Sequence, residues 1–351
     1  MAPTHASGTS KPTIVAAERP HLAPDEDATI VVRPPSARRW RVAAALALAL
    51  VLSAGGGVAV WLLRPPPPAV IVPAPVPAPR ITPAPAPAPF AIATADEATI
   101  DANVSERLAI FRFAPAPAVV VLDFASLEQQ GQMLNRVAAL IEKAGLPRER
   151  VLSDAELDTA IRASGDTPAT YYYGHDYSAA ELVRFFALAD RDHVALTAEE
   201  TRLRALLRQL GWFAPDTVGA LISIPRVGAD ANVTPPARAT ILHHELSHGS
   251  FFSDAAYAQY VRAFWRTALT GQERADVRKF LGQQGYDTTD EDLMLNEMQA
   301  YVMFTYDPRF CKALNVGMTL GRRLALIAEF RDRLPDGWAK QALTHMTEAP
   351  Q

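Results

Sequence analysis

The hydrophobic and polar positions divide the chain into four segments of different character. Residues 1–41 show no sustained periodicity and predict a disordered tail. Residues 42–63 carry no charge and form an apolar run long enough to cross a bilayer as one helix. Residues 64–90 alternate proline with alanine or valine, a pattern typical of extended polyproline II structure. From 91 to 351 charged, polar and aromatic residues are mixed, as in a globular domain.

The apolar run at 42–63 is also compatible with a buried alanine-rich helix or a cleaved signal peptide. A signal peptide is disfavoured because the polar tail before the run is too long. Arg38, Arg39 and Arg41 precede the run and Arg64 alone follows it closely. The positive-inside rule then predicts a single-pass membrane protein with a cytoplasmic N-terminus and a periplasmic or otherwise extracytoplasmic domain.

The globular segment is punctuated by Ser/Thr-x-x-Glu sequences, which fit capping boxes at helix starts. They predict helices over 154–164, 179–189, 198–210 and 271–283. Short runs rich in β-branched residues predict strands at 118–124 and 219–227, and a third candidate lies at 192–197. No linker interrupts 118–340, so one domain is expected. The expected fold class is α+β, a predominantly helical domain with a small sheet, preceded by the transmembrane helix and the proline-rich linker.

Charge and cysteine content exclude several classes of site. The net charge is −4 and no long basic block occurs, so a nucleic-acid partner has no support. Cys311 is the single cysteine of the sequence, which excludes an internal disulfide framework and a multi-cysteine metal site. We expect Cys311 to be a small packed hydrophobic residue. The composition does not indicate an oligomeric state.

The stretch TILHHELSHGSFF, residues 240–252, contains the spacing His-Glu-x-x-His. Thr-Pro-Pro at 234–236 fits a helix start, so the stretch is expected to be helical. On a helix His244 and His248 share one face, a turn apart, and Glu245 is rotated from that face by about 100°. Two neutral imidazoles, an oxygen ligand and a water molecule form an open zinc site, with the glutamate as general base.

Glu297 is the candidate for the third ligand. A capping box at Thr288 predicts a helix over 289–305, one face of which is apolar except for this glutamate. A carboxylate in an apolar stripe is costly to bury without a cation, and a metal held by the two histidines would supply one. An arginine partner, or a stripe edge open to water, would explain the same pattern.

The two predicted helices resemble the metal site of the gluzincin class of zinc metallopeptidases, in which Asn-Glu on a second helix follows HExxH on the first. The matching residues are HELSH at 244–248 and Asn-Glu at 296–297, and the resemblance is limited to these helices. It implies one zinc ion bound by His244, His248 and Glu297, in a zincin-like domain.

The resemblance also assigns further roles. It implies Glu245 as general base and an edge strand that aligns an extended substrate, for which 219–227 is the candidate. Tyr301 stands where many gluzincins have an aspartate that orients a zinc-bound imidazole, and it can serve as an oxyanion donor or pack in the core. In YYYGHDYS, residues 171–178, His175 is a second candidate for contact with the substrate or its oxyanion. A packed aromatic loop is the alternative there.

Two neighbouring residues are less suited to the metal. Asp254 occupies the third-ligand position of the metzincin class, but Phe251 replaces the turn glycine that this class needs. His243 points about 100° away from His244 on a helix and is expected to pack in the core or beside the ligands.

The sequence as a whole predicts a membrane-anchored zinc metallopeptidase that hydrolyses peptide bonds. A zinc hydrolase acting on a non-protein amide such as cell-wall peptide is one alternative. A catalytically inactive zincin-like binding protein is the other. Endopeptidase and exopeptidase activity are equally compatible with the motif.

Overall fold

The computed structural model describes residues 89–348, with side chains up to 344. The predicted tail at 1–41, the predicted membrane span at 42–63 and the linker up to residue 88 lie outside the described residues. Within 89–348 no helix is long and apolar enough to cross a membrane. The expected fold class, which joined the domain to a transmembrane helix, is therefore corrected. The structure shows a predominantly helical domain with a small mixed sheet.

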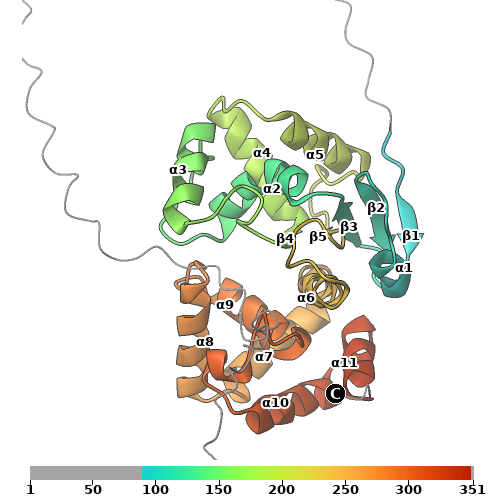
Figure 1. Cartoon of the computed structure of the whole chain (residues 1–351), viewed down its shortest axis with the longest axis vertical. Coiled ribbons are helices and arrows are strands. Elements are labelled where there is room, and N and C mark those ends of the chain that lie inside the picture. Colours follow the sequence, from blue (N-terminus) through green and yellow to red (C-terminus); the bar gives the residue numbers. More distant parts are fainter. Residues whose placement is uncertain (1–88, 349–351) are drawn as a thin grey trace, which may run out of the picture.

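One five-stranded sheet lies at the centre of the described chain (Figure 1). Its strands are β1 (Ala93–Ala95), β2 (Ala109–Phe113), β3 (Val119–Phe124), β4 (His175–Ser178) and β5 (Ala220–Pro225). Their spatial order is β1-β2-β3-β5-β4. Strands β3 and β5 are parallel, and β4 pairs with β5 in the antiparallel sense, with His175 opposite Ser223. This leaves β4 at one edge of the sheet.

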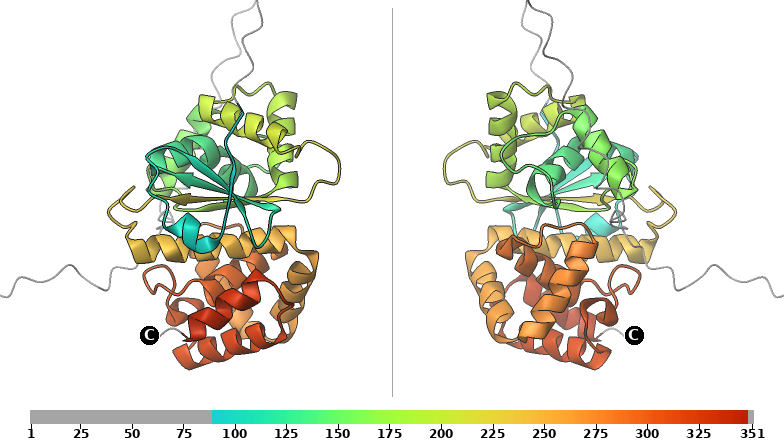
Figure 2. Two further views of the ribbon diagram at one scale, coloured as in Figure 1. Left: turned by 90° about the vertical axis from the view of Figure 1, so that its right-hand side faces the viewer. Right: turned by 90° about the vertical axis from the view of Figure 1, so that its left-hand side faces the viewer.

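Helices cover both faces of the sheet (Figures 1 and 2). On one side lie α2 (Leu127–Ile141), α3 (Asp154–Ser164), α4 (Ala179–Arg191) and α5 (Ala198–Gln209). On the other side α6 (Pro235–Ser253) packs against β3, β4 and β5. The short α1 (Glu97–Asp101) contacts α6.

A second layer of helices packs on the far side of α6. It contains α7 (Ala255–Thr267), α8 (Gly271–Gln283), α9 (Glu291–Met298), the π-helix η2 (Gln299–Phe304), the 3-10 helix η3 (Ala313–Val316), α10 (Leu320–Arg333) and α11 (Trp338–Glu348). Helix α6 is therefore enclosed between the sheet and this layer, which explains why its residues are buried almost all round.

The alternating side chains of β3 explain the two cores. Val119 and Val121 pack with α6 and the second helical layer, whereas Val120 and Leu122 pack with α2, α4 and α5. A strand covered on both faces reads as a continuous apolar run. Helix α6 approaches β3 closely at Gly249, where an added Cβ would lie 2.8 Å from Val119 Cγ1.

Most elements predicted from local signals are confirmed. The four helices with Ser/Thr-x-x-Glu boxes appear as α3, α4, α5 and α8, and the motif stretch is helix α6. The runs at 118–124 and 219–227 are strands β3 and β5. The candidate strand at 192–197 is wrong, because this segment is the turn and coil that connects α4 to α5.

Two predictions about the site elements are also wrong. The second site helix is capped by Asp290, whose carboxylate accepts from Leu293 N at 3.1 Å, and not by Thr288. The helix also widens into a π-helix at Gln299. The strand at 219–227 is not at the edge, since β5 is paired on both sides and β4 takes the edge position.

Candidate metal centre

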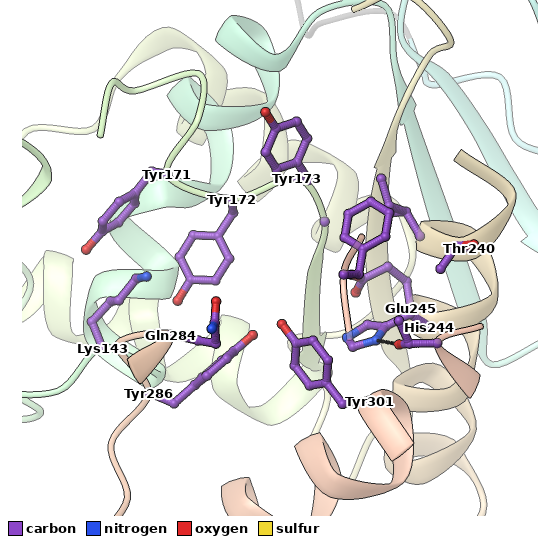
Figure 3. Close-up of a pocket in the computed structure, with 14 residues that line it drawn as sticks. Lys143, Tyr171, Tyr172, Tyr173, Thr240, His244, Glu245, Gln284, Tyr286 and Tyr301 are labelled. Carbon is purple, nitrogen blue, oxygen red and sulfur yellow. Dashed lines mark hydrogen bonds between the residues drawn. The ribbon is translucent and has the colours of Figure 1, made fainter. Parts of the chain in front are cut away.

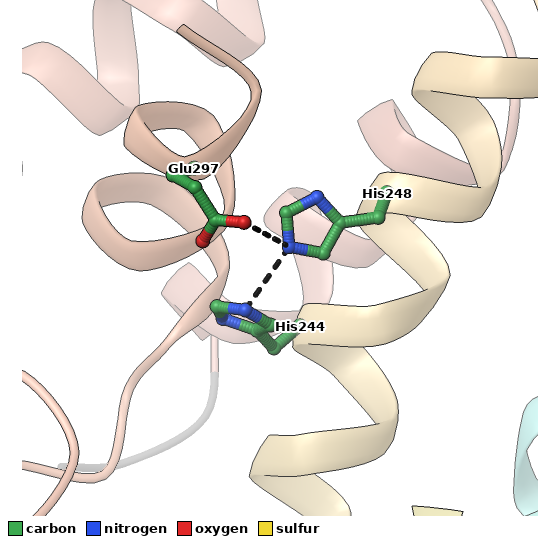
Figure 4. Close-up of side chains that lie close together, drawn as sticks. All are labelled: His244, His248 and Glu297. Atoms are coloured by element: carbon green, nitrogen blue, oxygen red, sulfur yellow. Dashed lines mark hydrogen bonds and ion pairs between the residues drawn. The ribbon is translucent and has the colours of Figure 1, made fainter. Parts of the chain in front are cut away.

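The HExxH residues lie in the second half of α6, where this helix faces α9 and η2. Thr234 caps the helix by accepting a hydrogen bond from Ala237 N at 3.4 Å. The two imidazoles and the side chain of Glu297 point toward one another across this contact (Figure 4). The sequence-predicted ligands are therefore brought together from two helices.

The ligand atoms converge at spacings that suit one ion. His244 Nε2 and His248 Nε2 are 3.1 Å apart, and Glu297 Oε1 is 3.9 Å from His248 Nε2. One ligand atom from each of the three residues lies within 4.8 Å of the others. Tetrahedral zinc with Zn–N bonds of 2.0–2.1 Å separates two ligand nitrogens by about 3.3 Å. The donor set therefore fits a zinc ion.

The partners of the other ring nitrogens assign the tautomer of His244. The Thr305 hydroxyl donates to Ala300 O at 3.0 Å and lies 2.8 Å from His244 Nδ1. Since its one hydrogen is used, this hydroxyl accepts from His244 Nδ1–H. The lone pair of His244 then lies on Nε2.

Asp176 on β4 lies beside the second histidine. Its Oδ1 lies 3.5 Å from His248 Nδ1, and this nitrogen is buried without a hydrogen-bond partner among the described residues. The lone pair of His244 Nε2 faces His248 Nε2 at 3.1 Å. Asp176, Glu245 and His248 form a second group within reach of one ion. The first group fits zinc better, because it uses both imidazoles and leaves Glu245 free.

Burial keeps both histidines neutral, as metal ligands must be. It lowers the pKa of His248 to about 4, although the Asn296 side chain opposes this. It lowers the pKa of His244 well below its usual value, and the neighbouring His248 lowers it further. Neutral imidazoles present a lone pair to an incoming ion at pH 7.

Glu297 is a buried carboxyl group without a lysine or arginine partner among the described residues. It is 1% exposed, and its Oε2 has no hydrogen-bond partner. Burial raises its pKa well above the usual range and the charge of Glu142 raises it further, with smaller opposing effects of Tyr286 and Lys143. Among the residues that the structure describes, no arginine or lysine forms an ion pair with it. Neither the arginine partner nor the water-exposed stripe edge therefore accounts for this glutamate.

Glu245 lines a cavity of about 90 Å³ together with His244 (Figure 3). Burial raises the pKa of Glu245 well above its usual value, and Glu297 and Glu142 raise it further. Its Oε2 is buried without a hydrogen-bond partner. The backbone at Gly174 lies close to the Glu245 carboxylate, because an added Cβ would be 2.0 Å from Glu245 Oε1. A side chain at that position would displace the carboxylate.

Tyr301 and His175, the two candidates for contact with the substrate or its oxyanion, lie in different places. The Tyr301 ring packs edge-on against the His244 ring with centroids 4.7 Å apart, and it lines the cavity. His175 is buried in β4, where its Nδ1 lies 2.9 Å from Ser223 Oγ, and it is not among the residues that line this cavity. Burial lowers the pKa of His175 to about 3. His175 is therefore a packed core histidine.

His243, Asp254 and Cys311 lie outside the ligand group. The His243 ring packs against Phe304 and Trp338. Asp254 caps α7 by accepting from the two amides of residues 256 and 257. Cys311 is fully buried in the core.

The sequence did not predict Lys143, Tyr286 and Thr305 near the site, nor the position of Asp176 beside His248. Asp176 follows His175 in the stretch 171–178, and alternation along strand β4 turns these two side chains to opposite faces. Thr305 and Lys143 carry no local signal, because their positions depend on how distant segments meet.

Comparison with protein-family models, with curated proteins and with solved structures found no match for this chain. What the site can do follows from its own groups. Two neutral imidazoles and one carboxylate leave one position of a tetrahedral ion open. The buried carboxyl group of Glu245, whose pKa is raised, lies beside them and lines the cavity.

Proposed function

We propose that the chain is a zinc-dependent peptidase, with His244, His248 and Glu297 as ligands of one zinc ion and Glu245 as general base. The observation that supports this most is the convergence of the two Nε2 atoms with a Glu297 oxygen, while His244 Nδ1 is hydrogen-bonded to Thr305. The ligand types and their order along the chain are those of the gluzincins, which hydrolyse peptide bonds.

The roles divide between the ion and the chain. A bound zinc ion would supply Lewis-acid polarisation of the scissile carbonyl and of the attacking water molecule. Glu245 accepts the proton of that water at its carboxylate and delivers it to the leaving amine. Its Oε2 is buried without a hydrogen-bond partner, so this oxygen is free to accept the proton. Tyr301, which lines the cavity beside His244, supplies a hydroxyl to the developing oxyanion.

Metal analysis of the purified full-length chain tests the ligand set. We expect about one zinc ion per chain and loss of most of it in Glu297→Ala. Asp292→Ala on the same helix is the control, since Asp292 is exposed and pairs with Arg262. Equal zinc content in Glu297→Ala and the parent protein would refute the third-ligand assignment.

Hydrolysis of a peptide library tests the enzymatic role. Glu245→Gln should keep its zinc and lose about 10²- to 10⁴-fold in rate, the range of general-base effects. Zinc binding without any hydrolysis of peptides by the parent protein would instead indicate a binding protein. Muropeptides in a parallel assay separate a peptidase from a hydrolase of cell-wall amides.

A further inference from the structure

A lysine lines the same cavity as the candidate metal site. Lys143 is 7% exposed, and its Nζ lies 4.4 Å from the ring centroid of Tyr171 and 4.2 Å from that of Tyr172. No carboxylate of the described residues forms an ion pair with this ammonium. Tyrosine faces stabilise a cation only in part, so a desolvated ammonium still gains from an anionic partner.

The backbone around Lys143 closes the cavity at this end. Ala144 N donates to Gly285 O at 3.0 Å and Asp287 N donates to Glu142 O at 2.9 Å, which makes Lys143 and Tyr286 an antiparallel bridge. The bridge joins the segment after α2 to the segment after α8, one from each helical layer. A polypeptide in the cavity cannot continue through it.

The side chains of the bridge alternate between two spaces. Lys143 and Tyr286 line the cavity of the metal site, whereas Glu142 and Asp287 line a separate cavity of about 840 Å³. Alternate side chains of extended segments point to opposite sides, so the bridge forms a partition between the two spaces. An ion pair of Arg148 with Asp287, at 3.1 Å, reinforces it.

Charge is distributed unevenly along the closed cavity. Figure 3 shows Lys143 on the far side of Tyr172 and Tyr286 from His244 and Glu245. Of the residues that line this cavity in the described structure, Lys143 is the one lysine or arginine and Glu245 the one acid. The groups between them are tyrosine hydroxyls and the amide of Gln284.

We infer that Lys143 binds a carboxylate of the substrate at the closed end of the cavity, so that the protein acts beside a free C-terminal carboxylate, as a carboxypeptidase. This inference rests on the proposed peptidase function. A peptide that ends at the bridge places its terminal carboxylate on the ammonium and its preceding amide bonds toward His244 and Glu245. Burial lowers the pKa of Lys143 to about 8, which leaves the ammonium mostly protonated at pH 7.

Binding by the zinc-loaded full-length Glu245→Gln variant tests the inference without turnover. The probes are an N-acetylated tripeptide of neutral residues as free acid, the same peptide as C-terminal amide, and an amide that ends in glutamate. By calorimetry we expect the acid to bind at least about tenfold more tightly than the neutral amide, as for a charge-assisted contact. If the glutamate-ended amide binds as tightly as the acid, the carboxylate site accepts a side chain as well as a chain end.

Variants of the lysine complete the test. Lys143→Met should abolish the preference for the acid, and Lys143→Arg should restore part of it, which separates loss of charge from loss of folding. Lys279→Met, an exposed lysine on α8, should keep the full preference. Equal binding of acid and neutral amide, or an unchanged preference in Lys143→Met, would overturn the inference. A preserved preference without hydrolysis of any peptide by the parent protein would contradict the proposed function and leave the carboxylate site standing.

Discussion

At the scale of single residues, the site depends on side chains that hold its groups in place. Thr305 fixes the tautomer of His244 by accepting from its Nδ1, Asp176 lies beside His248 Nδ1, and Gly174 leaves room for the Glu245 carboxylate. Such partners orient the ligands and raise their basicity. Each of these residues can be replaced without changing a metal ligand, so its contribution to the site can be tested separately.

Thr305→Val should weaken zinc binding by about 10- to 100-fold, because His244 Nδ1 loses its acceptor. Competition with a chelator of known affinity measures the effect. Thr159→Val is a matched control, since the Thr159 hydroxyl also donates to a backbone carbonyl but lies on the exposed side of α3. Unchanged affinity in Thr305→Val would show that the threonine does not orient the ligand.

Gly174→Ala should reduce peptide hydrolysis by about 10²-fold with zinc content unchanged, since the new Cβ displaces Glu245 Oε1 and not a ligand. Rates and metal content are measured on the same preparation. Gly321→Ala adds a methyl group where nothing lies within 4 Å, and it should match the parent protein in both. A Gly174→Ala protein with full activity would contradict the role of this close approach.

At the scale of elements, buried polar groups join the two site helices. Gln299 Nε2 donates to Ser247 Oγ at 3.1 Å, and Tyr257 OH donates to Gln299 Oε1 at 2.6 Å. Beyond them, the Arg323 guanidinium donates to four backbone carbonyls, including those of Tyr301 and Thr305. The Arg323 guanidinium therefore holds the C-terminal end of the π-helix η2 in place. This fixes Thr305 at the position where its hydroxyl contacts His244 Nδ1.

Arg323→Met should lower the free energy of unfolding by about 3 kcal/mol or more, because several buried carbonyls lose their donor. Urea unfolding of the metal-free protein measures this loss without the stabilisation by zinc. Arg333→Met is the control on the same helix, α10, where the side chain is 68% exposed. A difference within about 0.5 kcal/mol of this control, the usual range for surface substitutions, would count against the anchoring role.

The contact between α8 and α10 should be sensitive to acid. Arg322 and the cap at Thr270 lower the pKa of Glu273 from 4.5 to about 2. Its stabilising contribution is therefore complete above pH 4.5 and is lost as the pH falls toward 2. Glutamine at this position can still serve the capping box. The stability difference between the parent protein and Glu273→Gln should thus shrink between pH 4.5 and 2, and a difference independent of pH would contradict this.

At the scale of the whole molecule, local and non-local features differ in how well the sequence predicts them. The caps of α3, α4, α5 and α8 depend on residues three apart, and these helices begin where their boxes predict. The pairing of His244 and His248 with Glu297 follows from helix periodicity and one apolar stripe. The edge position of β4, the π-helix and the bridge at Lys143 depend on contacts between distant segments, which no local pattern encodes.

The fold brings these distant parts together around α6. Arg238 of α6 donates to both carboxylate oxygens of Asp123 on β3, at 2.9 and 2.8 Å, in a fully buried pair. The sheet thus fixes one side of the helix, and η2 and α9 present Thr305 and Glu297 to the other. The same enclosure removes water from the histidines and lowers their pKa values.

X-ray absorption spectroscopy of the zinc-loaded full-length protein tests the central claim most directly, because it reads the donor atoms around the ion. The proposed site predicts one zinc ion with two imidazole nitrogens at about 2.0–2.1 Å, oxygen donors at the remaining positions and no sulfur. A spectrum with a single imidazole, with sulfur scattering, or a protein that binds no zinc would contradict the account.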